Sequence, residues 1–102
     1  MSVININREN YNLIEASDKK VLLDFYADWC GPCQMLSPII HQIAEARSDV
    51  MVAKINVDEN PELSQKFGVF SIPSLFVLNN GEIAAQSVGF KPKAAILAML
   101  DK

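Results

Sequence analysis

The two cysteines of the chain, Cys30 and Cys33, stand three positions apart. A disulfide across so short a loop removes little entropy from the unfolded chain, so stabilising the fold is a weak reason for it. A close pair of cysteines is more typical of redox chemistry or metal binding. Structural zinc needs four ligands, and His41 is the only histidine available to complete a set. The spacing therefore favours a redox pair and predicts no metal site, with an inert buried pair as the remaining alternative.

The cysteines lie where a strand is expected to give way to a helix. The apolar run 21–27 has the length and composition of a strand covered on both faces. A helix should begin near Gly31-Pro32, because proline suits the first turn, and Pro38 should kink it. Cys30 would then occupy the N-cap, where free backbone N–H groups stabilise a thiolate, with Cys33 one turn further within disulfide reach. For such a thiolate to meet a target, Cys30 must be exposed to solvent.

The remaining segments alternate between strand and helix patterns. Asn60 is a candidate cap for the third helix, Gly68 a candidate end, and Asn80-Gly81 a strong hairpin signal. The predicted strands are 3–6, 21–27, 51–57, 74–78 and 83–88, and the predicted helices are 8–17, one from 31, one from 61 and one from 92. The order β-α-β-α-β-α-β-β-α predicts an α/β fold in which about five strands form a mixed sheet flanked by about four helices.

Length and charge restrict the function further. The chain has 102 residues, half of them hydrophobic, and a net charge of -3. We expect one domain spanning residues 1–102, and no nucleic-acid binding, because no basic cluster exists. The N-terminus has no basic and apolar leader, and no apolar stretch reaches the length of a membrane span. We therefore expect a cytoplasmic protein with no membrane association.

The sequence around the cysteines resembles the thioredoxin family. The resemblance is carried by Trp29-Cys30-Gly31-Pro32-Cys33 after Phe25-Tyr26-Ala27, by Ala53 to Asp58, by Ile72-Pro73 and by Val88-Gly89. It covers essentially the whole chain and implies the thioredoxin fold and a protein-disulfide reductase. In this scheme Cys30 attacks a target disulfide, and Cys33 resolves the mixed disulfide. Gly31-Pro32 resembles the reducing members of the family, and a redox titration would decide the direction.

Two charged residues in predicted strands have alternative interpretations. From spacing alone, Asp24 could equally be an edge residue that reaches water. The resemblance matches it to a buried aspartate below the cysteines, where burial would raise its pKa and allow it to relay a proton to Cys33. Lys54 matches a lysine near that carboxylate, or else is a strand lysine that extends to solvent.

The resemblance also implies a substrate-docking surface. X–Pro bonds are usually trans, but the family proline matching Pro73 is cis and faces the cysteines. The backbone of Ile72 would then pair with an extended substrate segment. The expected docking residues are Trp29, Gly31, Pro32, Ile72, Pro73, Gly89 and Phe90. Phe25 and Phe76 are expected in the core, and His41 is given no role. Phe70 and Ser71 depart from the common family pattern, which leaves partner choice open.

The resemblance further implies that no cofactor is bound, and that reducing equivalents come from NADPH through a flavin-dependent thioredoxin reductase. Expected partners are that reductase and proteins with disulfides, and the chain is expected to be a monomer. The alternative is a non-catalytic thioredoxin-fold binding module or subunit. Replacing both Cys30 and Cys33 with serine distinguishes the two, because a module would keep its function.

Overall fold

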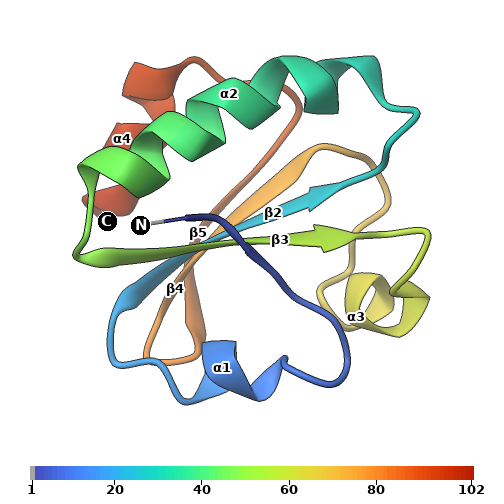
Figure 1. Ribbon diagram of the computed structural model, residues 1–102, viewed down its shortest axis with the longest axis horizontal. Helices are drawn as coiled ribbons and strands as arrows, with labels where there is room; N and C mark the ends of the chain where they lie inside the picture. The colour runs from blue at the N-terminus through green and yellow to red at the C-terminus, as the bar shows by residue number, and fades with distance from the viewer. Residues whose placement is uncertain (1) are drawn as a thin grey trace.

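A five-stranded mixed sheet with helices on both faces forms the protein (Figure 1). The computed structural model describes residues 2–102. The strands are β1 (Ile4–Asn5), β2 (Lys20–Tyr26), β3 (Val50–Asn56), β4 (Ser74–Asn79) and β5 (Glu82–Val88). The helices are α1 (Asn12–Glu15), α2 (Gly31–Ala46), α3 (Pro61–Lys66) and α4 (Lys93–Leu100). The predicted order of elements and the mixed α/β architecture are confirmed.

Strand β2 lies at the centre of the sheet, in the order β1-β3-β2-β4-β5. It pairs in parallel with β3 and antiparallel with β4, so that Asp24 is opposite Lys54 on one side and Leu75 on the other. Residues 21–25 are all buried, which agrees with the prediction of a strand covered on both faces. Because the chain runs from the end of β2 into α2, the redox pair stands at the end of the central strand.

The two faces of the sheet bury separate apolar clusters. Leu22 packs with α2 and α4, and its neighbour Leu23 packs with α1 and α3 on the opposite face. Since side chains alternate along a strand, Asp24 shares the face of Leu22 and points toward the α2 side. The same alternation places Lys54 on that face, because Val52 packs with α2 and Ala53 does not. Phe25 and Phe76 are core residues, as expected.

The hairpin and most helix ends follow the sequence prediction. Asn80 and Gly81 both have positive φ, at 52° and 82°, which is the backbone that a two-residue hairpin turn requires. Gly68, also at positive φ, follows the end of α3. Helix α2 continues through Pro38 as far as Ala46.

Two local predictions are wrong. The first helix is much shorter than 8–17, because asparagine side chains bind the backbone before it: Asn7 Oδ1 accepts from the N–H of Glu9 and Asn10. Asn60 occupies the N-cap position of α3 without capping it, because its side chain donates to the Asn56 carbonyl instead.

Candidate active site

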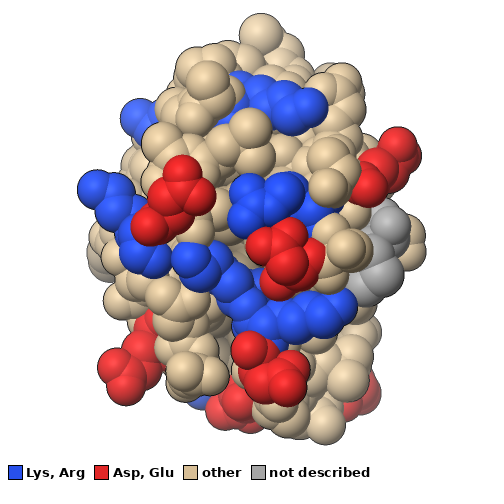
Figure 2. Space-filling model, turned by 90° about the vertical axis from the view of Figure 1, so that its left-hand side faces the viewer, with Lys and Arg blue, Asp and Glu red and all other residues tan. Residues whose placement is uncertain are grey.

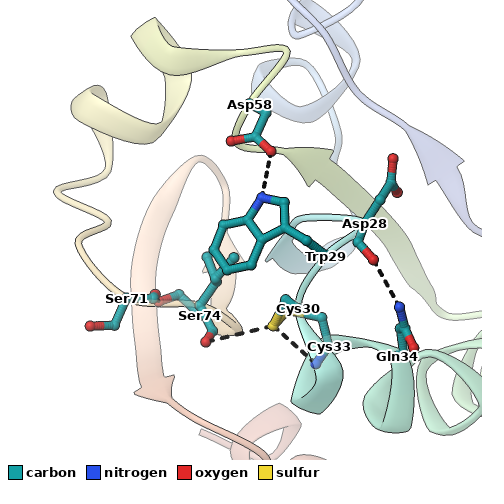
Figure 3. The surroundings of a disulfide bond; sticks show 9 residues. Asp28, Trp29, Cys30, Cys33, Gln34, Asp58, Ser71 and Ser74 are labelled. Atoms are coloured by element: carbon teal, nitrogen blue, oxygen red, sulfur yellow. Dashed lines mark hydrogen bonds between the residues drawn. A yellow bond between two sulfur atoms is a disulfide. The ribbon is translucent and has the colours of Figure 1, made fainter.

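Cys30 is the N-cap residue of α2 and forms a disulfide with Cys33. Its extended backbone, with φ of -90° and ψ of 111°, changes to helix at Gly31, with Pro32 in the first turn. The two Cα atoms are 5.2 Å apart, within the range that a disulfide allows. The backbone N–H of Cys33 donates to Cys30 Sγ over 3.2 Å, as Figure 3 shows. A free helix N–H group therefore points at the sulfur that would carry negative charge after reduction.

The expectation that Cys30 is exposed is wrong for the disulfide form. Each cysteine keeps only 4 % of its surface accessible. Part of this burial is the bond itself, since each sulfur covers the other, and part comes from Ala27 and Ile72, which pack against the pair. In the disulfide form, a target therefore does not meet a protruding sulfur.

Trp29 directly precedes Cys30 and is held by Asp58, a residue that the sequence alone did not single out. The residue is 71 % exposed, and its Nε1–H donates to Asp58 Oδ2 over 2.8 Å (Figure 3). Asp58 follows β3, and Trp29 follows β2. The carboxyl ends of adjacent parallel strands meet at one edge of a sheet, which is the signal that could have identified this contact. Gly31 and Pro32, next along the chain, are exposed.

The loop that precedes β4 contacts the disulfide from the other side. The Ile72–Pro73 peptide bond is cis, in agreement with the resemblance. The carbonyl oxygen of Ile72 lies 3.9 Å from Cys30 Sγ. The carbonyl of Pro73 accepts a hydrogen bond from the N–H of Gly89 over 2.8 Å. This brings Gly89, which has positive φ, and the adjoining Phe90 to the same loop.

Asp24 is a buried carboxylate, which rules out the alternative of an edge residue in water. It is 4 % exposed, and its Oδ1 has no hydrogen-bond partner within residues 2–102. Burial raises the pKa of Asp24 from 3.8 to about 7, and the positive charge of Lys54 opposes part of this rise. The group is therefore divided between acid and base near neutral pH, which suits proton transfer.

A pocket of about 230 Å³ leads from the surface to the inner cysteine. Cys33 and Lys54 both line it, with Tyr26 and Gln34 among the other lining residues. Lys54 is half-buried, and its Nζ lies 5.2 Å from the centroid of the Tyr26 ring. The pocket is large enough for several water molecules, so water can reach Cys33.

Several large apolar side chains are exposed on the surface. Besides Trp29 they include Phe70, at 99 % exposed, Phe90, at 40 %, and Met35, which the sequence reasoning did not assign. Ser71 is also exposed, and His41 lies on the surface of α2. Within residues 2–102, no cluster of histidine, cysteine or acidic side chains has an arrangement that could hold a metal ion.

Comparison with known proteins gives one consistent result. A thioredoxin family model matches residues 2–102. A thioredoxin of Alicyclobacillus acidocaldarius is 43 % identical over 97 % of this chain and 95 % of its own, and one of Bacillus subtilis is 42 % identical over 100 % and 98 %. The solved structure of a mutant thioredoxin from Halobacterium salinarum superposes with a TM-score of 0.89 at 39 % identity, covering 98 % of this chain and 88 % of that one.

The fold and the cysteine pair define a thiol–disulfide oxidoreductase. With the matching family model and relatives, the chain belongs to the thioredoxin family. Proteins of this family exchange their own dithiol for the disulfide of a target, and they work with disulfide-containing proteins and with a reductase. None of the helices within residues 2–102 has the length and apolar character needed to cross a membrane.

Proposed function

We propose that Cys30 is the attacking thiolate and Cys33 the resolving one in the reduction of protein disulfides. The Cys30 thiolate forms a bond to one sulfur of the target, and the second target sulfur leaves with the electron pair of the broken bond. Cys33, after losing its proton, then attacks Cys30 Sγ and displaces the first target sulfur as a thiolate. The target gains two electrons, and the protein becomes the disulfide. The hydrogen bond from the Cys33 N–H to Cys30 Sγ carries the assignment, because it stabilises charge on that sulfur.

Asp24 takes the proton of Cys33 in this proposal, with water in the pocket beside Cys33 as the connection. A pKa of about 7 allows Asp24 to accept and return a proton at neutral pH. Lys54 supports the role because it lines the same pocket and lies opposite Asp24 in the sheet. Its positive charge favours the ionised carboxylate and keeps Asp24 available as a base.

The proposed docking surface consists of the residues around Cys30. Ile72 offers backbone groups to an extended target segment, in the manner of an added strand. Trp29, Gly31 and Pro32 form one border of the surface. Pro73, Gly89 and Phe90 form the other, which the hydrogen bond between Gly89 and Pro73 supports. Met35, two positions after Cys33, and Phe70, two positions before Ile72, are exposed apolar residues that could extend this surface.

In the cell, NADPH supplies the reducing equivalents through a flavin-containing thioredoxin reductase. The protein acts in the cytoplasm as a monomer, residues 1–102 form one domain, and nucleic acids are not its partners. The family membership and the Gly31-Pro32 pair between the cysteines support a reducing role. Mixed charge on the face seen in Figure 2, where acidic groups interrupt the basic ones, supports the absence of nucleic-acid binding. Sedimentation at several protein concentrations tests whether the protein is a monomer.

Trapping of the mixed disulfide tests the assignment of the two cysteines. Cys33→Ser should accumulate a covalent complex with insulin, because the resolving thiol is missing and Cys30 still attacks. The complex should disappear on reduction and should be seen by non-reducing electrophoresis and mass spectrometry. Cys30→Ser is the matched control and should form no complex. Trapping by Cys30→Ser instead would reverse the roles, and trapping by neither would contradict the mechanism.

A further inference from the structure

Ser74 is a buried polar residue that the exchange mechanism does not use. It is the first residue of β4 and is 3 % exposed. Its backbone lies opposite Phe25 of β2 and Val88 of β5, so the sheet holds it from both sides. Its hydroxyl donates to the carbonyl of Ser71 over 2.6 Å, a short distance for a hydrogen bond between oxygens. The hydroxyl thus links the rigid sheet to the loop beside the disulfide (Figure 3).

The carbonyl groups of this loop fall into two kinds. Those of Ser71 and Pro73 are bound, the first by Ser74 and the second by the N–H of Gly89. The residue between them, Ile72, has no backbone hydrogen bond within residues 2–102, either from its N–H or to its carbonyl. Its carbonyl lies against Cys30 Sγ. The loop is therefore fixed on each side of Ile72, whose backbone groups remain available to a ligand.

We propose that Ser74 is a positioning residue, whose hydroxyl fixes the orientation in which Ile72 presents its backbone groups to an extended target segment. The inference rests on the proposed function, because it assumes a target bound next to Cys30. Groups that bind a ligand act best when a rigid element and a second layer of hydrogen bonds hold them. Ser71 itself is an exposed residue, so the hydroxyl of Ser74 ties a surface loop to a buried position of the sheet.

Single-turnover kinetics with two kinds of disulfide test this role. The reduced protein is mixed with increasing insulin, which offers a peptide segment, or with bis(hydroxyethyl) disulfide, which offers none, and acid-quenched samples are separated by chromatography. For Ser74→Ala, loss of one hydrogen bond should raise the half-saturating insulin concentration by about 3- to 10-fold. The limiting rate and the rate with the small disulfide should stay within about twofold.

Further variants separate positioning from stability. Ser74→Thr keeps the hydroxyl and should restore the insulin kinetics, whereas Ser74→Val has nearly the same shape without it and should behave as Ser74→Ala. Ser64→Ala is the matched control, because Ser64 is also buried and also donates to one carbonyl, that of Asn60. It should leave both reactions unchanged.

The outcomes distinguish this role from the proposed function. Wild-type kinetics for Ser74→Ala with both substrates, or an equal loss with both, would overturn the positioning role and leave the oxidoreductase function intact. Failure of the wild-type protein to reduce either disulfide would instead contradict the proposed function itself. Equal behaviour of Ser74→Thr and Ser74→Val would also overturn the role, because the hydroxyl is their main difference.

Discussion

Asp24 illustrates how a single buried group ties stability to pH. Its pKa rises from 3.8 to about 7 on folding, chiefly because burial penalises the charged form. Between these values the folded chain holds a proton that the unfolded chain has lost, so stability falls as pH rises through this window. Above about pH 7 both states are ionised, and the full penalty of about 4 kcal/mol is present.

Replacement of this carboxyl group by an amide should therefore stabilise the protein at alkaline pH. We expect Asp24→Asn to raise the free energy of unfolding at pH 8 by up to about 4 kcal/mol, and by much less at pH 4. Urea unfolding at several pH values provides the measurement. Glu9→Gln, which changes an exposed carboxylate, serves as the control and should keep the wild-type dependence. An identical rise in the free energy of unfolding of Asp24→Asn at pH 4 and pH 8 would show that the ionisation of Asp24 is not the cause.

The residues at the site differ in how far the sequence identified them. The position of Cys30 and Cys33 at a helix start was predictable, because apolar periodicity and Pro32 mark that junction. The low exposure of Cys30 was not, since it depends on Ile72, 42 positions away in the chain. The burial of Asp24 was also not predictable from spacing alone. It follows from the pairing of β2 with both β3 and β4, which makes β2 a central strand and not an edge strand.

At the scale of elements, the β4–β5 hairpin depends on backbone conformation more than on packing. Gly81 has φ of 82°, and a Cβ placed there would meet nothing within 4 Å. Any destabilisation by Gly81→Ala therefore comes from the left-handed backbone conformation. We expect this substitution to lower the free energy of unfolding by about 1 kcal/mol. Urea unfolding curves of the two proteins give this difference from their midpoints, provided that the slopes of the transitions are equal.

Gly31 offers a matched control for this substitution. A Cβ there would also meet nothing within 4 Å, and its φ is not positive. Gly31→Ala in the disulfide form should be neutral or slightly stabilising, because alanine favours helices. If the two alanine variants lost the same stability, strain at the hairpin turn would not be the cause.

The element boundaries that the sequence missed have a common origin in asparagine. Asn7 and Asn10 bind backbone groups around them, and this turn replaces the first part of the predicted helix 8–17. Asn60 donates to the backbone of Asn56 and leaves the start of α3 uncapped. Asparagine suits a cap and a turn equally well, and only the finished fold decides which contact forms. The strand order β1-β3-β2-β4-β5 likewise depends on contacts between distant segments.

At the scale of the whole molecule, Lys20 joins the beginning of the central strand to the end of the chain. Its Nζ donates to the carbonyl of Leu100, at the end of α4, and to that of Lys102 over 3.3 Å. Positive charge at the C-terminal end of a helix is favourable. Helix α4 is therefore held to the sheet by this polar contact as well as by its buried residues, Ile96 and Leu100.

Loss of this contact should loosen α4 in particular. We expect Lys20→Met to lower the free energy of unfolding by about 1 kcal/mol, and to speed amide hydrogen exchange in α4 more than in β3. Lys19→Met is the control, because Lys19 donates to the Ser48 carbonyl instead and should leave α4 exchange unchanged. Uniform acceleration of exchange throughout the sheet would argue against a local role of Lys20.

The indole of Trp29 adds an optical property to the molecule. It is the only tryptophan of the chain and precedes Cys30 in the sequence, and Asp58 accepts a hydrogen bond from its nitrogen. A disulfide quenches the light that a neighbouring indole emits, whereas thiols quench it less. We therefore expect the emission intensity of Trp29 to rise when the disulfide is reduced, so that the unlabelled protein would report its own oxidation state.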